Sequence, residues 1–223
     1  GDVPIVQKDL IRKCNLAGKQ VITATQMLDS MQWNPRPTRA EASDVANAIF
    51  DGTDAVMLSG ESAVGQYPVE TVAMMARIAE RTEEALEANG GNLSALSMFD
   101  KASVTEAISQ AAARTVMNLG IKTIVAATSS GHTARMISKY RPKANILAAT
   151  YSERVQRGLT LVWGVQAFVI AEPENVDDML NNVTALAKEK GFAQPGDAIV
   201  ITAGTPIRES GTTNLMKIER IPD

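Results

Sequence analysis

The 223-residue sequence has few of the residues that build disulfide frameworks, metal centres and aromatic binding surfaces. Its single cysteine, Cys14, excludes a disulfide framework and a cysteine-rich metal site, and it fits a reducing compartment. The single histidine, His132, excludes a histidine-rich metal centre, and no group of acidic residues has the pattern of a magnesium site. Aromatic residues make up only 4% of the chain, which argues against binding of single-stranded nucleic acid by base stacking.

Long apolar runs are also missing from the sequence. No run approaches the roughly 18 residues that indicate a membrane span. The first ten residues lack the basic start and apolar stretch of a signal peptide. The composition, with 45% hydrophobic and 21% charged residues, is typical of globular domains. We therefore expect a cytoplasmic protein with no membrane partner and no nucleic-acid partner.

The formal net charge of −3 conceals one basic stretch. Between residues 122 and 157 the only acidic residue is Glu153, and seven residues are basic: Lys122, Arg135, Lys139, Arg141, Lys143, Arg154 and Arg157. Such an excess attracts small anions, and it also attracts nucleic acid. The alternative is an ordinary solvated basic face, which charge alone does not distinguish from a binding site.

The first segment, residues 1–87, alternates helices with apolar strands. Thr38 and Glu41 have the spacing of a capping box, which predicts a helix start after the prolines of Asn34–Thr38. The expected order is helix Asp9–Ala17, strand Gln20–Ala24, helix 38–50, strand Asp54–Leu58 and helix Pro68–Leu86. Strands that are almost wholly apolar indicate a parallel sheet buried on both faces.

A Gly/Asn/Ser-rich stretch over residues 88–97 marks the expected linker, and a second α/β segment occupies residues 98–223. Its expected helices are Val104–Asn118, Thr133–Tyr140, Glu153–Leu159 and Val176–Glu189. Its expected strands are Thr123–Ala127, Asn145–Ala149, Gln166–Ile170, Ala198–Thr202 and Leu215–Ile221. About 130 residues suffice for a core of their own.

Two loops of the second segment have the composition of an anion site. The first joins an apolar strand to a helix and consists of Thr128, Ser129, Ser130, Gly131, His132 and Thr133. Hydroxyls, a glycine and backbone N–H groups at a helix start favour phosphate, although the same residues also form ordinary helix caps. The second loop, 204–214, follows another buried strand and carries Gly204, Ser210, Gly211 and Thr212. Because loops at the carboxyl ends of parallel strands share one rim, it is expected to close over the same ligand, or else to be only a long connection.

In the first segment, Thr25 lies just past one predicted strand, and Ser59 and Glu61 lie just past the next. The carboxyl ends of barrel strands are where catalytic groups sit. These three residues are therefore candidate site residues.

Residues 21–61 resemble the pyruvate kinase family through the motifs ATQMLDSM, NPRPTRAE, DVANA and DGTDAVMLSGE. The later motifs SSGHTARMISKYRP, GDAIVITAG and SGTTN are similar to the carboxyl-terminal domain of that family. The resemblance covers essentially all of this sequence but only the later half of the family's enzymes. It implies an α/β fold in which two terminal βα units of a (β/α)8 barrel are followed by an effector-binding domain.

By this resemblance, the complete enzyme transfers phosphate from phosphoenolpyruvate to ADP in glycolysis, using Mg²⁺ and usually K⁺, and it is a tetramer. Thr25 matches the family's active-site threonine, and Arg36 and Arg39 fall near the active site and a subunit contact. Ser59 and Glu61 fall in the vicinity of the substrate.

The family's phosphate-stabilising lysine, its Mg²⁺ and K⁺ ligands and its lid domain all lie upstream of this segment. The chain alone is therefore expected to be inactive. Two barrel units also cannot close a barrel, so residues 1–87 are expected to be the least stable part or to be held by other protein.

The resemblance also implies an allosteric site for a phosphorylated effector at the loops of residues 128–133 and 204–214. Relatives activated by fructose 1,6-bisphosphate carry an extra tryptophan and arginine after the third strand of this domain. Here Glu172–Asn175 has neither, which makes AMP or ribose 5-phosphate equal candidates. Besides the interpretation as part of an enzyme, two alternatives remain open at this point. One is a free-standing module that binds sugar phosphates or nucleotides, and the other is an oligomerisation element.

Overall fold

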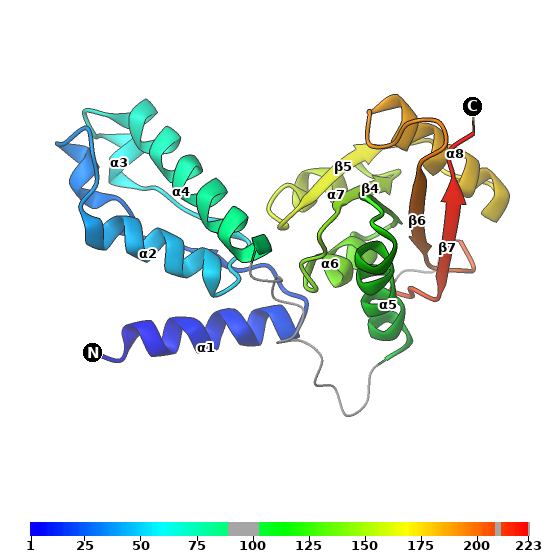
Figure 1. Ribbon diagram of the computed structural model, residues 1–223, viewed down its shortest axis with the longest axis horizontal. Helices are drawn as coiled ribbons and strands as arrows, with labels where there is room; N and C mark the ends of the chain where they lie inside the picture. The colour runs from blue at the N-terminus through cyan, green and yellow to red at the C-terminus, as the bar shows by residue number, and fades with distance from the viewer. Residues whose placement is uncertain (89–102, 208–210, 223) are drawn as a thin grey trace. The chain divides into compact units, whose positions relative to one another are not determined.

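The computed structural model describes residues 1–88, 103–207 and 211–222, and it divides into two compact units, Gly1–Gly91 and Asn92–Asp223 (Figure 1). We call them unit 1 and unit 2. The predicted linker over residues 88–97 lies outside the described residues except for its first residue, Ala88. No described helix has the length and apolar character needed to cross a membrane.

Unit 1 contains two βα pairs preceded by a helix. Its elements are α1 (Val3–Leu16), β1 (Ile22–Thr23), the 3₁₀ helix η1 (Asp29–Gln32), α2 (Arg39–Phe50), β2 (Ala55–Val56), α3 (Gly60–Ala63) and α4 (Pro68–Ala88). The strands pair in parallel, with Ile22 opposite Ala55. Apolar residues of α2, α4 and the segment after β1 form one core around Leu28, Met31 and Val45.

Two predictions about unit 1 were wrong in extent. Helix α1 begins at Val3 rather than at Asp9. Pro4 is tolerated in its first turn because the backbone N–H groups there have no acceptor within the helix, so the N–H that proline lacks is not needed. Each predicted five-residue strand is reduced to two residues. Pairing defines a strand, and among the described residues each of these strands has one partner.

The predicted capping box is present at the start of α2. The hydroxyl of Thr38 accepts a hydrogen bond from the backbone N–H of Glu41, and a carboxylate oxygen of Glu41 accepts one from the N–H of Thr38 at 2.8 Å. The same carboxylate accepts the backbone N–H and the hydroxyl of Ser30, both at 2.6 Å. Burial alone raises the pKa of Glu41, but these hydrogen bonds outweigh it, and the pKa lies below its ordinary value. Glu41 therefore ties the start of α2 to the segment that follows β1.

Unit 2 is a five-stranded sheet with helices on both faces (Figure 1). Its helices are α5 (Val104–Leu119), α6 (His132–Ser138), α7 (Glu153–Leu159) and α8 (Val176–Glu189). Its strands are β3 (Thr123–Ala127), β4 (Asn145–Thr150), β5 (Val165–Val169), β6 (Ala198–Ala203) and β7 (Leu215–Arg220). The order is β5-β4-β3-β6-β7, parallel except for β7, which pairs antiparallel with β6.

Alternate residues of the central strands supply two separate cores in unit 2. Ile124, Ala126 and Ile146 face α5, α6 and α7, whereas Val125, Leu147 and Ile199 face α8. This double burial explains why the strands are apolar at nearly every position. The chain runs from β3 outward to β5 and then returns to the other side of β3 as β6. The strand order therefore reverses between β3 and β6, where open α/β sheets commonly bind ligands.

Candidate functional site

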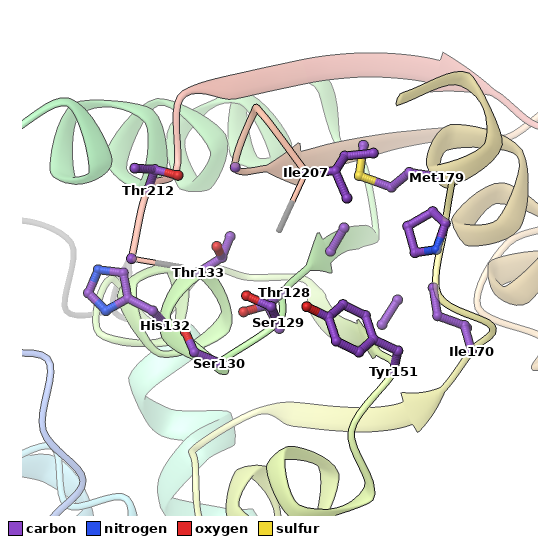
Figure 2. A pocket seen from close by; sticks show the side chains of 15 residues that line it. Thr128, Ser129, Ser130, His132, Thr133, Tyr151, Ile170, Met179, Ile207 and Thr212 are labelled. Carbon is purple, nitrogen blue, oxygen red and sulfur yellow. The ribbon is translucent and has the colours of Figure 1, made fainter. Parts of the chain in front are cut away.

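A recess open to solvent lies at the carboxyl ends of the strands of unit 2, and its free space is about 520 Å³. The loops after β3, β4, β5 and β6 and the start of α8 all contribute to it (Figure 2). Its lining residues among those described are Ala127, Thr128, Ser129, Ser130, His132, Thr133, Ala149, Tyr151, Ile170, Pro173, Met179, Gly204, Ile207, Gly211 and Thr212. The recess thus lies at the point where the strand order reverses.

The loop after β3 brings hydroxyl groups to one side of this recess. Thr128 is only 8% exposed, yet its hydroxyl has no hydrogen-bond partner among the described residues. The side chains of Ser129 and Ser130 line the recess beside it (Figure 2). Because the recess is open to solvent, these hydroxyls are available to hydrogen-bond water or a ligand.

Gly131 gives this loop its shape. It has a φ of 78°, and α6 begins directly after it with no side-chain cap among the described residues. A Cβ at Gly131 would lie 2.7 Å from Nη1 of Arg135, so a larger residue there would displace the side chain that packs under the loop. The glycine therefore permits both the turn and the close packing.

The loop after β6 is fastened to the same region by buried threonines. The hydroxyls of Thr133 and Thr213 lie 2.8 Å apart, and both residues are at most 3% exposed. The backbone N–H of Thr213 donates to Oγ1 of Thr105, in the first turn of α5, at 3.2 Å. A Cβ at Gly204 would lie 2.1 Å from the carbonyl oxygen of Thr212, so only glycine allows the two ends of this loop to approach. Thr133 therefore helps to hold the loop in place, and it also lines the recess.

Of the residues predicted in the second loop, the structure places Gly204, Gly211 and Thr212 on the recess. Ser210 lies outside the described residues.

The basic side chains of residues 122–157 do not line the recess. Among the described residues that line it there is no lysine or arginine. Instead, Arg135 donates to the carbonyl oxygen of Ser130 at 3.1 Å, and the guanidinium of Arg141 lies 4.8 Å from the ring centre of Trp163. Lys139 pairs with Glu106 at 3.0 Å, and Arg157 pairs with Glu153 at 3.1 Å. None of these four side chains lines the recess, so the structure favours the alternative of an ordinary basic face for them.

The charges near the recess nevertheless affect His132. Burial lowers the pKa of His132 below its ordinary value, and the positive charges of Arg135 and Lys139 lower it further. The imidazole is thus neutral at pH 7 without a bound anion. The negative charge of a bound dianion would oppose the effect of the two cations on this pKa.

The carboxyl ends of β1 and β2 in unit 1 hold the other predicted site residues. Thr25 and Gln26 follow β1 with φ values of 69° and 54°. Two consecutive residues other than glycine in the left-handed region are uncommon and cost roughly 1–3 kcal/mol each. Thr25 is exposed, and its hydroxyl donates to the carbonyl oxygen of Ala24 at 2.7 Å.

Glu61 is buried beneath this turn and is only 1% exposed. One carboxylate oxygen accepts the N–H of Leu28 at 3.1 Å, and the other accepts the N–H of Ser59 at 2.8 Å. The carboxylate therefore joins the loop after β1 to the loop after β2. Ser59, Arg36 and Arg39 are exposed.

Glu61 also bears on the question of a metal in unit 1. Both of its carboxylate oxygens are engaged by backbone N–H groups. In the described part of the chain, no three His, Cys, Asp or Glu side chains converge. These residues do not fit a metal centre, and we derive no step of a reaction through one.

Several residues of the recess were missed by the sequence analysis. Tyr151, Ile170 and Pro173 follow strands whose carboxyl ends were predicted, so the shared-rim rule was a usable signal for them. Met179, from α8, and Thr105, which holds Thr213, come from distant parts of the chain and gave no local signal.

Comparisons with known proteins identify the family. Residues 1–72 match the sequence profile described as "Pyruvate kinase, barrel domain", and residues 106–219 match "Pyruvate kinase, alpha/beta domain". This chain belongs to the pyruvate kinase family. The pyruvate kinase of Lactobacillus delbrueckii subsp. bulgaricus is 57% identical over 223 residues, and that of Geobacillus stearothermophilus is 56% identical over 222 residues. These alignments cover 99% and 100% of this chain.

The chain spans 38% of the length of each of these two pyruvate kinases. The crystal structure of a pyruvate kinase from Cryptosporidium parvum matches 99% of this chain and 44% of its own, with a TM-score of 0.88 and 41% identity. The resemblance to pyruvate kinase is confirmed. The expected fold class, two terminal βα units of a barrel followed by the family's α/β domain, is confirmed as well.

Proposed function

We propose that this segment works within a complete pyruvate kinase that transfers phosphate from phosphoenolpyruvate to ADP, giving pyruvate and ATP. Membership of the family supports this proposal, and so does the position of Thr25 at the carboxyl end of β1. Mg²⁺ and K⁺ belong to the complete enzyme in the cytoplasm, with their ligands outside this chain. In this proposal Thr25 is the catalytic residue, while Arg36, Arg39 and Ser59 lie in the vicinity of the substrate.

The chain alone is expected to be inactive. Among the described residues of unit 1, no three His, Cys, Asp or Glu side chains converge to hold the metal ion whose charge stabilises phosphoryl transfer. A coupled assay with phosphoenolpyruvate, ADP and both metal ions should show no pyruvate formation above background. Measurable turnover by the purified 223-residue chain would contradict this part of the proposal.

The second part of the proposal is that the recess of unit 2 binds the phosphate group of an allosteric effector. The observation that carries it is the nearly buried, unpartnered hydroxyl of Thr128 beside Ser129 and Ser130, at the point where the strand order reverses. Phosphate oxygens accept hydrogen bonds from such hydroxyls and from the backbone N–H groups of the same loop. AMP, ribose 5-phosphate and fructose 1,6-bisphosphate are the candidate effectors.

A thermal-shift titration of the chain with these three compounds and with sulfate tests this binding. A ligand at one hundred times its Kd adds about 2.7 kcal/mol of stability, which raises the Tm of a unit of this size by several degrees. The double variant Ser129→Ala with Ser130→Ala should abolish the shift, whereas Thr160→Ala, outside the recess, should retain it. If no compound shifts the Tm at millimolar concentration, the effector proposal fails.

The complete enzyme is further proposed to be a homotetramer. In unit 2, Met117 of α5 is an exposed apolar residue, and we take it as a candidate for burial at a subunit contact. Sedimentation of the complete enzyme, with Met117→Glu as the variant and Leu161→Glu as the exposed control, tests this assignment. A monomeric wild-type enzyme would exclude it.

A further inference from the structure

The turn at Thr25 and Gln26 in unit 1 is not held by hydrogen bonds of its own backbone. Within the described part of the chain, the N–H groups of these two residues have no acceptor, and the Thr25 hydroxyl reaches only the neighbouring carbonyl oxygen of Ala24. Both φ values nevertheless lie in the left-handed region. Such a conformation persists only where the surrounding structure fixes it, so the contacts that hold this turn lie before and after it.

Before the turn, the chain is held by strand pairing. Thr23 lies opposite Val56 in the β1–β2 pair, and its buried hydroxyl donates to Oγ1 of Thr53 at 3.0 Å. The position of the Thr25 side chain therefore depends on how the residues that follow it are held.

After the turn, the chain is held by the carboxylate of Glu61. Leu28 is fully buried, and its backbone N–H donates to one carboxylate oxygen at 3.1 Å. The other oxygen accepts the N–H of Ser59 at 2.8 Å. A carboxylate has two acceptor oxygens for two such donors, whereas an amide has one. Glu61 thus joins the segment that follows Thr25 to the end of β2.

The loop that carries Glu61 packs closely against the loop after β1. A Cβ at Gly60 would lie 2.7 Å from Oε1 of Gln32, and a Cβ at Gly65 would lie 3.1 Å from the Cα of Gln32. The backbone N–H of Gln66 donates to the carbonyl oxygen of Gln32 at 2.8 Å. The position of the carboxylate is therefore set by the fold and does not depend on a ligand.

Glu61 and Thr25 differ in their access to a substrate. Glu61 is 1% exposed and both of its oxygens accept backbone N–H groups, whereas Thr25 is exposed. A buried carboxylate with this bonding is suited to holding the backbone in place rather than to contacting a substrate.

From these contacts we propose that Glu61 is the positioning residue of Thr25. Its carboxylate fixes the segment after the strained turn, and this fixes the place of the Thr25 hydroxyl. The inference rests on the proposed catalytic role of Thr25 and adds the residue through which the fold controls it. A displacement of about 1 Å at a reacting group costs about 10²-fold in rate, so loss of this contact should be visible in kcat.

A double-mutant cycle in the complete pyruvate kinase that contains this segment tests the inference. Glu61→Ala should lower kcat at least about tenfold and leave the KM values for phosphoenolpyruvate and ADP within about threefold. In a Thr25→Ala background the same change should lower kcat by less than about twofold, because the hydroxyl that Glu61 positions is already absent. Equal fold losses in both backgrounds would overturn the inference and leave the role of Thr25 intact. An unchanged kcat in Thr25→Ala alone would instead refute the proposed role of Thr25, and the inference with it.

Two further variants separate position from stability, because Glu61→Ala also removes a buried contact. Glu61→Gln, whose amide oxygen still accepts the Leu28 N–H, should recover part of kcat, and it replaces Glu61→Ala in the cycle if that enzyme does not fold. Thr82→Ala removes a buried hydroxyl of α4 that donates to the carbonyl oxygen of Ile78 at 2.7 Å. It should lower the stability of unit 1 and leave kcat unchanged. A loss of kcat in Thr82→Ala as large as that in Glu61→Ala would assign the effect to stability and overturn the inference.

Discussion

Units 1 and 2 are both built from βα pairs, but only unit 2 covers its sheet. In unit 2 the central strands are buried on both faces by helices on either side. In unit 1 each strand has two residues, and apolar side chains remain exposed, among them Val3 at 74%, Val64 at 81% and Val69 at 75%. The comparison shows that local βα geometry forms without a closed core, whereas stability requires that the apolar faces be covered.

The loops at the strand ends of the two units differ in whether their polar side chains are available to a ligand. In unit 2 the hydroxyl of Thr128 is left without a partner and lines a recess. In unit 1 the buried carboxylate of Glu61 is fully used in joining two loops. The recess that we propose as a binding site is therefore formed within unit 2 alone, whereas the turn at Thr25 in unit 1 borders no such recess among the described residues.

The largest expected difference between the units is in resistance to proteolysis. Limited digestion with a protease of broad specificity should cleave unit 1 at least tenfold faster than unit 2, because exposed apolar surface and short strands favour local opening. The persistent product should retain α5 to β7, as mass spectrometry of early fragments would show. Loss of unit 2 before unit 1 would reverse the comparison.

The next largest effect is expected from Glu61→Ala. It removes the acceptor of the buried Leu28 N–H, and an unsatisfied buried donor costs about 1–3 kcal/mol. Unit 1 should lose about 2 kcal/mol of stability, and unit 2 should lose nothing. Trp33 lies in unit 1 and Trp163 in unit 2, so urea titrations of Trp33→Phe and Trp163→Phe backgrounds report the two units separately.

Glu61→Gln is the matched variant for this experiment. The amide oxygen still accepts the Leu28 N–H, but the amide NH₂ group faces the Ser59 N–H, and two donors cannot bond each other. We therefore expect unit 1 to lose less stability than in Glu61→Ala. An equal loss from both units would mean that the effect of Glu61 is not confined to the two loops that it joins.

The features that sequence predicted well are those set by neighbouring residues. Strand Thr123–Ala127 and helices Glu153–Leu159 and Val176–Glu189 were predicted with the bounds that the structure has. The capping box of α2 was predicted from its spacing, and the equivalent box of Ser103 and Glu106 was readable but overlooked. The hydroxyls of residues 128–130 were found because they are consecutive.

The features that sequence could not supply depend on distant partners. The excess of basic residues left open whether they form an anion site or a solvated face, because partners such as Glu106, 33 residues before Lys139, are remote in the sequence. Thr133 was expected to face a ligand and it lines the recess, but only the fold reveals that its hydroxyl also bonds that of Thr213, 80 residues away. Tyr151 and Met179 line the same recess only because the sheet brings the loop after β4 and the start of α8 to one edge.

The ion pair of Lys139 and Glu106 should make the stability of unit 2, but not that of unit 1, depend on pH. The backbone N–H of Ser103 and then the Lys139 ammonium lower the pKa of Glu106 below its ordinary 4.5. A lowered pKa stabilises the fold above the ordinary value, and this stability is lost as the pH falls through the folded value. Lys139→Met should cost about 2 kcal/mol at pH 7, because Lys139 is only 2% exposed while Glu106 is partly open to water.

The difference in stability between Lys139→Met and the wild type should narrow as the pH falls through the folded-state pKa of Glu106, which lies below 4.5, because only below that value is Glu106 protonated in both proteins. Urea titrations at pH 7 and at a series of pH values below 4.5, followed through Trp163, measure this difference. A difference that does not depend on pH would assign the effect of Lys139 to packing rather than to its charge.

The smallest expected effect is the pH dependence of anion affinity at His132. It tests the contrast between the recess of unit 2, which is proposed to bind an anion, and the turn at Thr25 in unit 1, which is not. Burial and then the charges of Arg135 and Lys139 hold the pKa of His132 below 6.5, so the ring is neutral in the free protein at pH 7.5. A bound dianion favours the protonated ring, and binding should therefore take up part of a proton and become tighter as the pH falls. Sulfate is the suitable probe because its charge is constant over this range. Its affinity should rise a few-fold between pH 7.5 and pH 5.5 in the wild type and stay flat in His132→Gln. A slope of equal size in the variant would assign the proton to another group.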